Sequence, residues 1–354
     1  MARPLASSLT VTSERRGLLV RLVCESGVEG WGEAWNNFPS WGSRDRALFI
    51  SRDLAPEIIG CNPLDRDALI RRVFNRFTGI GHVWGAIGVV YEAISAIDIA
   101  LWDIVAQAHE KPLWRMLGGE WPGRIAPYAS GIDQQGLGDR LEELVGRGFS
   151  AFKVRVGFDP DRDLEAVRLA RRVVGDDAAL MVDANQGWSR DTAAYACSRF
   201  ADLGLRWVEE PLVADDFEGL AFLRERTGVT VAAGEDVYGR PSFEQLAARI
   251  PIVQPDVAKH GGITALCDLL EVARSKGSRL IPHYFGSAIG LAATLHFIAG
   301  LCEEPLLEMD ASGNPLVYDL VPGFPAMEDG VVRVPDGPGL GVRPDSEALG
   351  RFAD

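Results

Sequence analysis

From residue 125 onward the chain alternates short apolar runs with amphipathic segments. The runs begin near residues 125, 151, 179, 206, 229, 251, 279 and 305, and most precede a segment, such as 164–174 or 265–275, with apolar residues three and four apart. Strands that alternate with helices form a parallel sheet, and eight such units close a barrel. An open doubly wound sheet is the alternative, but it usually carries a glycine-rich phosphate turn after its first strand, and none follows Ser130. We therefore predict an α/β fold with a modified TIM-type (β/α) barrel.

The first part of the chain has a different pattern. Residues 18–24 (LLVRLVC) and 30–34 are predicted antiparallel strands joined by a turn at 25–27, and helices are expected over 45–59 and 86–109. The passage LGGEWPG (117–123) suggests a crossing between domains, and GVVRVPDGPGLGV (330–342) has strand and turn character. We predict an α+β capping domain over residues 1–117, a barrel over 118–329, and a tail over 330–354 that returns to the capping domain.

Charge and cysteine usage exclude several classes of partner. The 354 residues carry a net charge of −14, which argues against nucleic acid or an anionic membrane surface. The apolar stretch 88–108 is interrupted by three acidic residues, and residues 1–17 lack the apolar core of a secretory signal. The five cysteines are scattered without CxxC spacing, as expected of free thiols in a reducing cytoplasm. We expect a cytoplasmic protein that binds a small molecule.

Polar residues end seven successive predicted strands. They are Lys153 and Arg155 on the second strand, followed by Asp183, Glu209, Glu235, Asp256, His283 and Glu308. A charged residue at one strand end is usually part of a structural ion pair. A barrel, however, brings all of these ends to its C-terminal mouth, where such barrels hold their active sites.

The types of these residues indicate two kinds of chemistry. Asp183, Glu209 and Glu235 form an all-oxygen set suited to a hard divalent cation. Alternatively, they neutralise Lys153 and Arg155, although three carboxylates against two cations leave charge uncompensated. On the next two strand ends, the carboxylate of Asp256 can orient the imidazole of His283, whose other nitrogen then serves as a general base.

Several motifs together resemble one family. FKVRVG (152–157), MVDANQGW (181–188), WVEEPL (207–212), AAGED (232–236), QPDVAKHGGIT (254–264), IPHYFG (281–286) and LEMD (307–310) are similar to motifs of the mandelate racemase subgroup of the enolase superfamily. AISAIDIALWDI (93–104) and PDGPGLGV (335–342) resemble its capping-domain helix and C-terminal tail. The resemblance covers nearly the whole chain and implies a Mg²⁺-dependent enzyme that removes the proton α to a carboxylate through an enolate. The use of a Lys or His base with Mg²⁺ is a general feature of that superfamily.

The resemblance also implies roles for individual residues. Asp183, Glu209 and Glu235 match the Mg²⁺ ligands, with Glu210 next to them. Asp256 and His283 match an Asp–His dyad, whereas Glu308 and Lys153 match groups that hold the substrate carboxylate or stabilise the enolate. Substrate contacts are expected from Asn185 and from the capping loop, at Asn36 and Trp41. A sugar acid is the expected substrate and a homo-oligomer the expected assembly.

Arg155 departs from the family pattern. Members with a Lys-x-Lys pair use the second lysine as a base, whereas a guanidinium stays protonated and acts as a clamp for carboxylates or hydroxyls. A racemase needs a base on each face of the substrate carbon, so arginine favours dehydration of a sugar acid with His283 as the only base. Lactone cycloisomerisation follows closely, and racemisation or epimerisation is a further alternative. A binding protein on an inactive barrel would require a missing ligand or base, and none is missing from the sequence.

Overall fold

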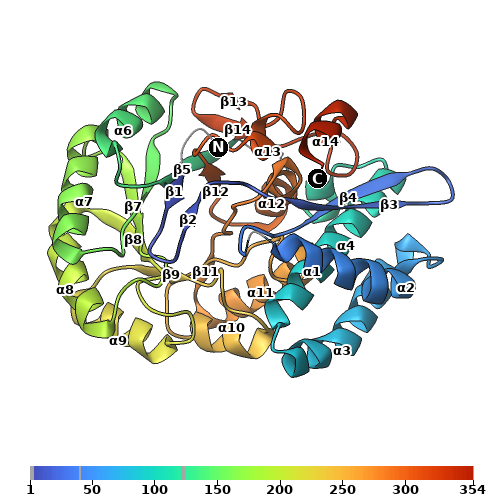
Figure 1. Ribbon diagram of the computed structural model, residues 1–354, viewed down its shortest axis with the longest axis horizontal. Coiled ribbons are helices and arrows are strands. Elements are labelled where there is room, and N and C mark those ends of the chain that lie inside the picture. The colour runs from blue at the N-terminus through green and yellow to red at the C-terminus, as the bar shows by residue number, and fades with distance from the viewer. Residues whose placement is uncertain (1–3, 40, 121–123, 354) are drawn as a thin grey trace.

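The protein is seen in a computed structural model that describes residues 4–39, 41–120 and 124–353. Over these ranges, eight parallel strands build the larger domain, on the left of Figure 1. They are β5 (Arg124–Ile132), β6 (Ala151–Arg155), β7 (Ala179–Asp183), β8 (Leu205–Glu209), β9 (Val231–Ala233), β10 (Ile252–Val253), β11 (Arg279–Leu280) and β12 (Leu306–Asp310). Each strand pairs with the next from β5 to β11, and β12 pairs with β5. Among the described residues β11 and β12 share no ladder, so the ring is least regular there.

Seven helices follow the first seven of these strands and cover the outside of the barrel. They are α6 (Leu137–Gly146), α7 (Pro160–Val174), α8 (Arg190–Phe200), α9 (Phe217–Thr227), α10 (Arg240–Ala247), α11 (Gly262–Lys276) and α12 (Ala288–Leu301). Their apolar faces pack on the sheet; in α7, for example, Leu164 and Val167 are buried and Asp159 caps the first turn. After β12 comes only the short α13 (Pro315–Tyr318), and this makes the barrel a modified one.

Three barrel strands are shorter than predicted. The apolar runs that begin near 229, 251 and 279 were expected to reach Glu235, Asp256 and His283, but β9 to β11 end before these residues. Gly234 has a φ of 137°, and Pro255 and Pro282 have no N–H to donate to a ladder. The chemistry-bearing residues therefore lie in the loops just beyond these strands.

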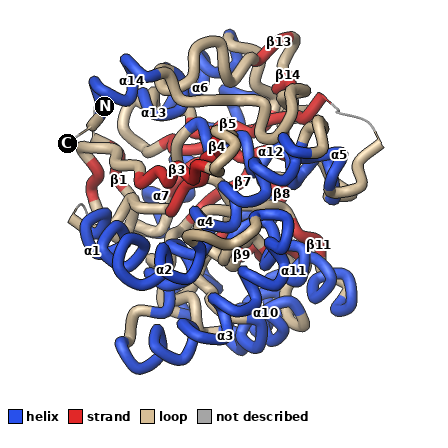
Figure 2. The backbone as a smooth tube through the Cα atoms, turned by 90° about the vertical axis from the view of Figure 1, so that its right-hand side faces the viewer, coloured by secondary structure: helices blue, strands red, loops and turns tan. Residues whose placement is uncertain are grey.

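The capping domain lies beside the barrel, on the right of Figure 1, and contains the predicted hairpin of β3 (Leu18–Val23) and β4 (Glu29–Ala34). The predicted helix 86–109 is α4 (Ile87–Ala108), which contacts both β4 and the barrel helix α11 (Figure 2). The predicted helix 45–59 is α1 (Gly42–Phe49) and α2 (Ala55–Ile58), joined by a π-helical turn.

Besides the short α5 (Leu113–Met116) and a 3₁₀ turn at Pro63–Asp65, two elements of this region were not predicted. The first is α3 (Arg66–Trp84), although its buried Leu69, Val73 and Phe77 recur at the helical spacing of four. The second is a small hairpin of β1 (Leu5–Ala6) and β2 (Val11–Thr12), whose strands are too short to give a period.

The tail contacts both domains. It forms β13 (Met327–Glu328), β14 (Val331–Arg333) and α14 (Ser346–Phe352), and β14 pairs with β5 of the barrel. Further on, Leu340 N donates to Asp103 Oδ1 of α4 at 2.8 Å. The expected crossing at 117–123 lies partly outside the described residues, and the three domain boundaries stay predictions.

Strand β4 lies against the backbone of α4 at two glycines. A Cβ atom on Gly30 would collide with the carbonyl oxygen of Ala100, and one on Gly32 with that of Ala96. Glycine is required at both positions because the helix backbone occupies the space of a side chain.

We expect Gly32→Ala to lower the free energy of unfolding by about 1–3 kcal/mol or more, since strand and helix must move apart. Gly138→Ala is the matched control, because a Cβ there meets nothing within 4 Å and alanine favours the helix α6. Urea unfolding of the two variants measures the difference. Equal stabilities would contradict the close approach of β4 and α4.

Candidate active site

The barrel interior contains an apolar layer with a polar layer above it. The apolar layer holds one buried residue from each strand or its continuation: Tyr128, Ala151, Met181, Trp207, Ala232, Ile252, Ile281 and Leu306. Side chains two positions apart on a strand point to the same face. Two positions further along the chain stand Ser130, Lys153, Asp183, Glu209, Gly234, Gln254, His283 and Glu308. The alternation of the strands therefore places five of the predicted site residues on one level of the mouth: Lys153, Asp183, Glu209, His283 and Glu308.

Lys153 joins three carboxylates in this polar layer. Its Nζ contacts Glu209, lies 2.7 Å from Glu308 Oε1 and 3.9 Å from Asp183 Oδ2, and its side chain is 2% exposed. Burial lowers the pKa of Lys153, but Glu209 and Glu308 raise it further, to well above its ordinary value. Lys153 is therefore a permanent cation at the centre of the mouth.

The negative charge around Lys153 exceeds its single positive charge. Asp183 and Glu209 are register partners on β7 and β8, and Glu209 Oε2 also accepts hydrogen bonds from Trp207 Nε1 and Gln254 Nε2. Burial raises the pKa of Glu209 to about 7, and the nearby Asp183 adds to this shift although Lys153 opposes it. The site therefore has excess negative charge, which an additional cation would compensate.

A second group of carboxylates adjoins the first. Among the described residues, oxygens of Glu210, Glu235 and Asp236 come within 4.8 Å of one another, which differs from the predicted set of Asp183, Glu209 and Glu235. Glu235 is common to both sets. Glu210 is 2% exposed, has a left-handed φ of 39°, and neither of its carboxylate oxygens has a hydrogen-bond partner. Burial, with Glu235 and Asp236, raises its pKa well above the ordinary value. Glu210 is thus a buried carboxylate without a partner, whereas Glu235 and Asp236 are partly exposed and contact His283 and Lys259. A group of carboxylate oxygens of this kind fits a hard divalent cation.

His283 and Asp256 form the predicted dyad. His283 Nδ1 lies 2.8 Å from Asp256 Oδ2, the two residues form an isolated parallel bridge, and both side chains are buried. The other ring nitrogen, Nε2, contacts Glu235. Burial lowers the pKa of His283, whereas Glu235 and Glu308 raise it, and the result is well above its ordinary value. A cation that neutralised Glu235 would bring this pKa down toward the range of a general base.

The other predicted residues lie in different surroundings. Arg155 donates from Nη1 to Ala6 O at 3.2 Å, and its guanidinium is 5.6 Å from the Phe285 ring. Asn185 donates to Asp183 Oδ2 at 3.0 Å, and its buried Oδ1 has no hydrogen-bond partner. Asn36 is 2% exposed, and both polar atoms of its amide lack partners. These free amide atoms suit the hydroxyl groups of a ligand.

Trp41 does not join this group in the structure. It precedes α1, and its side chain is 65% exposed. Within the described residues, its side chain makes no hydrogen bond or aromatic ring contact. Its predicted contact with the substrate stays a prediction.

The sequence analysis did not single out Lys259, Tyr128 and Arg15, which make polar contacts in or near the barrel mouth. Lys259 is 1% exposed, with Nζ 2.7 Å from Asp236 Oδ1 and 4.3 Å from the Trp35 ring centre. Its place three residues after Asp256 could have drawn attention to it. Tyr128 donates to Glu308 Oε2 at 3.0 Å, and Arg15 lies 3.1 Å from Asp310 Oδ2. Nothing in the sequence around Arg15 predicts that contact, since it comes from an irregular segment.

Comparison with known proteins identifies the family and the fold. Residues 1–118 match the family described as "Mandelate racemase / muconate lactonizing enzyme, N-terminal domain", and residues 136–348 match "Enolase C-terminal domain-like". The chain belongs to the mandelate racemase/muconate lactonizing enzyme family of the enolase superfamily. It is an enzyme with the enolase-superfamily fold, as predicted.

Members of the superfamily with related sequences are named as isomerases and dehydratases. A D-galactarolactone cycloisomerase of Agrobacterium fabrum is 30% identical over 99% of this chain and 94% of its own. An arabinonate dehydratase of Saccharolobus solfataricus is 30% identical over 89% and 84%. A racemase structure from Streptomyces coelicolor A3(2) with bound magnesium has a TM-score of 0.90 and 28% identity, covering 100% of this chain and 96% of its own. None of the described helices is long and apolar enough to traverse a bilayer.

We expect Lys153→Met to destabilise the metal-free enzyme by about 3–5 kcal/mol at pH 8, because it leaves buried carboxylates without their cation. The loss should shrink toward pH 5.5, where carboxylates with raised pKa values become protonated. Urea unfolding in the presence of a chelator measures both values. The exposed Lys276→Met is the control, and an equally stable Lys153→Met at pH 8 would refute the charge balance described above.

Proposed function

We propose that this enzyme removes the proton α to the carboxylate of a sugar acid and then expels the β-hydroxyl group as water. The observation that carries the proposal is the Asp256–His283 pair, which stands at the barrel mouth against a surplus of buried carboxylates. The pair provides one base, and the carboxylates provide a place for a divalent cation. Relatives named as sugar acid dehydratases support the same reaction class.

Mg²⁺ would be held by Asp183, Glu209 and Glu235. Asp183 and Glu209 are partners in the sheet register, and Glu235 has an oxygen in the neighbouring carboxylate group. Glu210, which follows Glu209, would then lie beside the three ligands without binding the cation directly. When bound, Mg²⁺ would act as a Lewis acid toward the substrate carboxylate, which is worth several kcal/mol in the transition state.

The side chains of the chain divide the remaining work. Neutral His283 takes the α-proton at Nε2, and the electron pair of the C–H bond moves into the carboxylate to give an enolate. Lys153, already a permanent cation, stabilises the charge that develops on the enolate oxygens. Glu308, which contacts Lys153 and Tyr128, would bind the substrate carboxylate in its protonated form, by donating a hydrogen bond to it. The imidazolium then gives its proton to the β-oxygen as the C–O bond breaks.

Arg155 favours elimination over racemisation. A guanidinium group does not act as a general base, so Arg155 cannot remove a proton from the opposite face of the substrate carbon. It would instead bind a carboxylate or a hydroxyl group of the substrate. Asn36 and Asn185, with their unpartnered amide atoms, are the proposed contacts for further hydroxyl groups, and Trp41 remains a candidate from the capping loop.

Cycloisomerisation is the second candidate. In a lactone or an anhydro sugar acid the β-oxygen belongs to a ring, so its expulsion opens the ring and gives an isomer of the substrate. The same His283 base would serve, and two relatives that cover most of the chain are named as cycloisomerases. A library of sugar acids and their lactones, analysed by mass spectrometry, separates the two, since only dehydration removes the mass of water.

His283→Asn should abolish turnover and also exchange of the substrate α-proton with deuterated solvent. A positioned general base contributes roughly 10²–10⁴-fold, so the loss should be at least of that order. NMR of the substrate in D₂O measures exchange independently of product formation. Arg155→Lys is the companion variant, because it introduces a second possible base. Rapid exchange in His283→Asn would show that the base lies on the opposite face of the substrate carbon, and it would favour epimerisation.

Chelation should abolish activity, and added Mg²⁺ should restore it. Glu209→Gln should weaken Mg²⁺ binding by about tenfold or more, since an anionic ligand is lost. Isothermal titration of the metal into the protein measures this without a substrate. Glu218→Gln, at an exposed residue, is the control. Wild-type metal affinity in Glu209→Gln would show that Glu209 is no ligand.

A further inference from the structure

We propose that the end of strand β4 and the residues just after it, from Glu33 to Asn37, position the Asp256–His283 dyad, and that Glu33 is the principal positioning residue. The inference rests on the proposed function of the dyad and assigns the capping domain a part in the chemistry. A cap that only selects substrates would not need to bind the loops that carry the base.

Glu33 binds the beginning of the helix that follows His283. Its Oε1 accepts a hydrogen bond from Ser287 N at 2.8 Å, and its Oε2 accepts from Ser287 Oγ at 2.6 Å and from Gly290 N at 2.7 Å. The side chain is 1% exposed. A carboxylate at the first turn of α12 also interacts favourably with the helix dipole. Glu33 therefore fixes the chain four residues after His283.

The sequence of this loop leaves space for Glu33. A Cβ atom on Gly286 would lie 2.8 Å from Glu33 Oε1, and one on Gly290 would lie 2.6 Å from Oε2. Both distances are too short for a carbon, so only glycine allows the carboxylate to approach from both sides. The loop is shaped around a residue of the other domain.

The next residues of the same segment form hydrogen bonds with the loops that carry His283 and Asp256. Asn37 Nδ2 donates to Phe285 O at 2.6 Å, two residues after His283. Trp35 N donates to Ala258 O at 3.0 Å, and Ala258 N in turn donates to Asp256 Oδ1 at 2.7 Å. The segment 33–37 is thus hydrogen-bonded to the His283 loop at two points and to the Asp256 loop at one.

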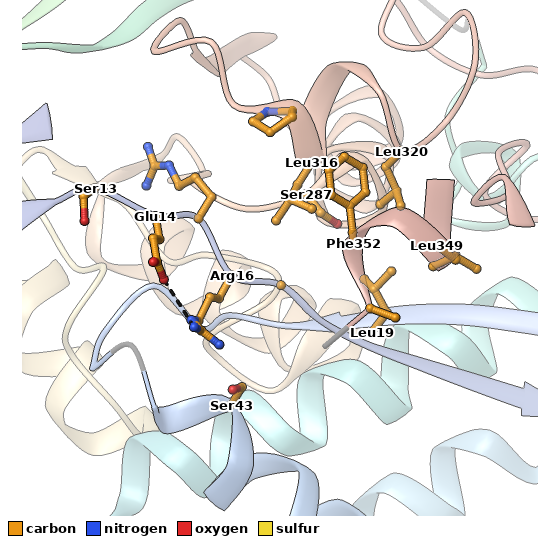
Figure 3. Close-up of a pocket in the computed structure, with 14 residues that line it drawn as sticks. Ser13, Glu14, Arg16, Leu19, Ser43, Ser287, Leu316, Leu320, Leu349 and Phe352 are labelled. Carbon is orange, nitrogen blue, oxygen red and sulfur yellow. Dashed lines mark hydrogen bonds and ion pairs between the residues drawn. The ribbon is translucent and has the colours of Figure 1, made fainter. Parts of the chain in front are cut away.

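The barrel also restrains these loops, although its strands are short here. β10 and β11 have two residues each, and beyond them Asp256 and His283 form an isolated bridge, with His283 N donating to Pro255 O at 3.2 Å. Tyr284 N donates to Glu308 Oε2 at 3.3 Å. Ser287 also lines a cavity of about 660 Å³ together with Leu19, Leu316 and Phe352 (Figure 3). Hydrogen bonds from the capping domain therefore add to those of the barrel in fixing the position of the loop.

Glu33→Gln tests the proposal, because glutamine has nearly the volume of glutamate but carries no charge. One of the two carboxylate oxygens becomes an NH₂ group, which cannot accept a hydrogen bond. We expect kcat to fall about 10–100-fold while KM changes little, the range found when a partner of an active-site group is lost. Glu33→Asp should recover part of kcat because it keeps the carboxylate. Asp103→Asn is the matched control: Asp103 is also a buried carboxylate that accepts from backbone N–H groups, of Trp31 and Leu340, but it is remote from the dyad.

A second readout needs no substrate. The chain has five histidines, and the Nδ1 proton that His283 shares with Asp256 should give a resolved low-field NMR signal. We expect this signal to shift or broaden in Glu33→Gln and to stay unchanged in Asp103→Asn. If no sugar acid is ever turned over, the proposed function fails, but the NMR result still tests positioning.

The proposal is overturned if Glu33→Gln lowers kcat no more than Asp103→Asn does and leaves the His283 signal in place. If Glu33→Gln does not fold, Ser287→Ala takes its place; it removes the hydroxyl donor to Glu33 and also the side-chain oxygen that caps α12 at Ile289 N. A smaller loss of kcat with a shift of the same signal supports positioning. Unchanged kcat and an unchanged signal in Ser287→Ala refute it.

Discussion

The balance of buried charge at the barrel mouth is the constraint on which the rest of the structure depends. Strand alternation places Lys153, Asp183, Glu209 and Glu308 directly above a dry apolar layer, where charges are poorly screened. Lys153 compensates the charge of one carboxylate, whereas burial, together with the remaining negative charge, raises the pKa values of Asp183 and Glu209. Such a site is costly without a cation, and it is suited to stabilise negative charge that appears during a reaction.

The position of the dyad follows from a different constraint. His283 and Asp256 lie beyond the strands, where Pro255 and Pro282 end the ladder. His283, the proposed base, lies on a loop, and hydrogen bonds from the neighbouring domain, through Glu33 and Asn37, supplement those of the barrel. The interface between the domains therefore adjoins the proposed site.

The barrel and most of its polar residues could be predicted because both follow from short-range periodicity. A residue two positions beyond an apolar strand residue must face the same side, and this alone brings Lys153, Asp183, Glu209 and Glu308 together. Interactions between distant segments could not be predicted in this way. Arg15 reaches Asp310 across nearly the whole chain, and the left-handed turn at Glu210 depends on the loop that surrounds it. The helix α3 has buried apolar residues at helical spacing, so it could have been predicted from the sequence.

Two roles are proposed for the capping domain: positioning of the dyad by Glu33 and substrate contact at Trp41. The residues that serve them differ in how freely they can change during evolution. Glu33 is bound by backbone N–H groups and is enclosed by Gly286 and Gly290, so a substitution at any of these three positions disturbs the other two. Trp41, by contrast, is mostly exposed. A lineage that acquires a new substrate can therefore vary the chain after residue 40 while it retains the β4 terminus. Residues that vary with the substrate and residues retained for proton abstraction would then lie fewer than ten positions apart in one segment.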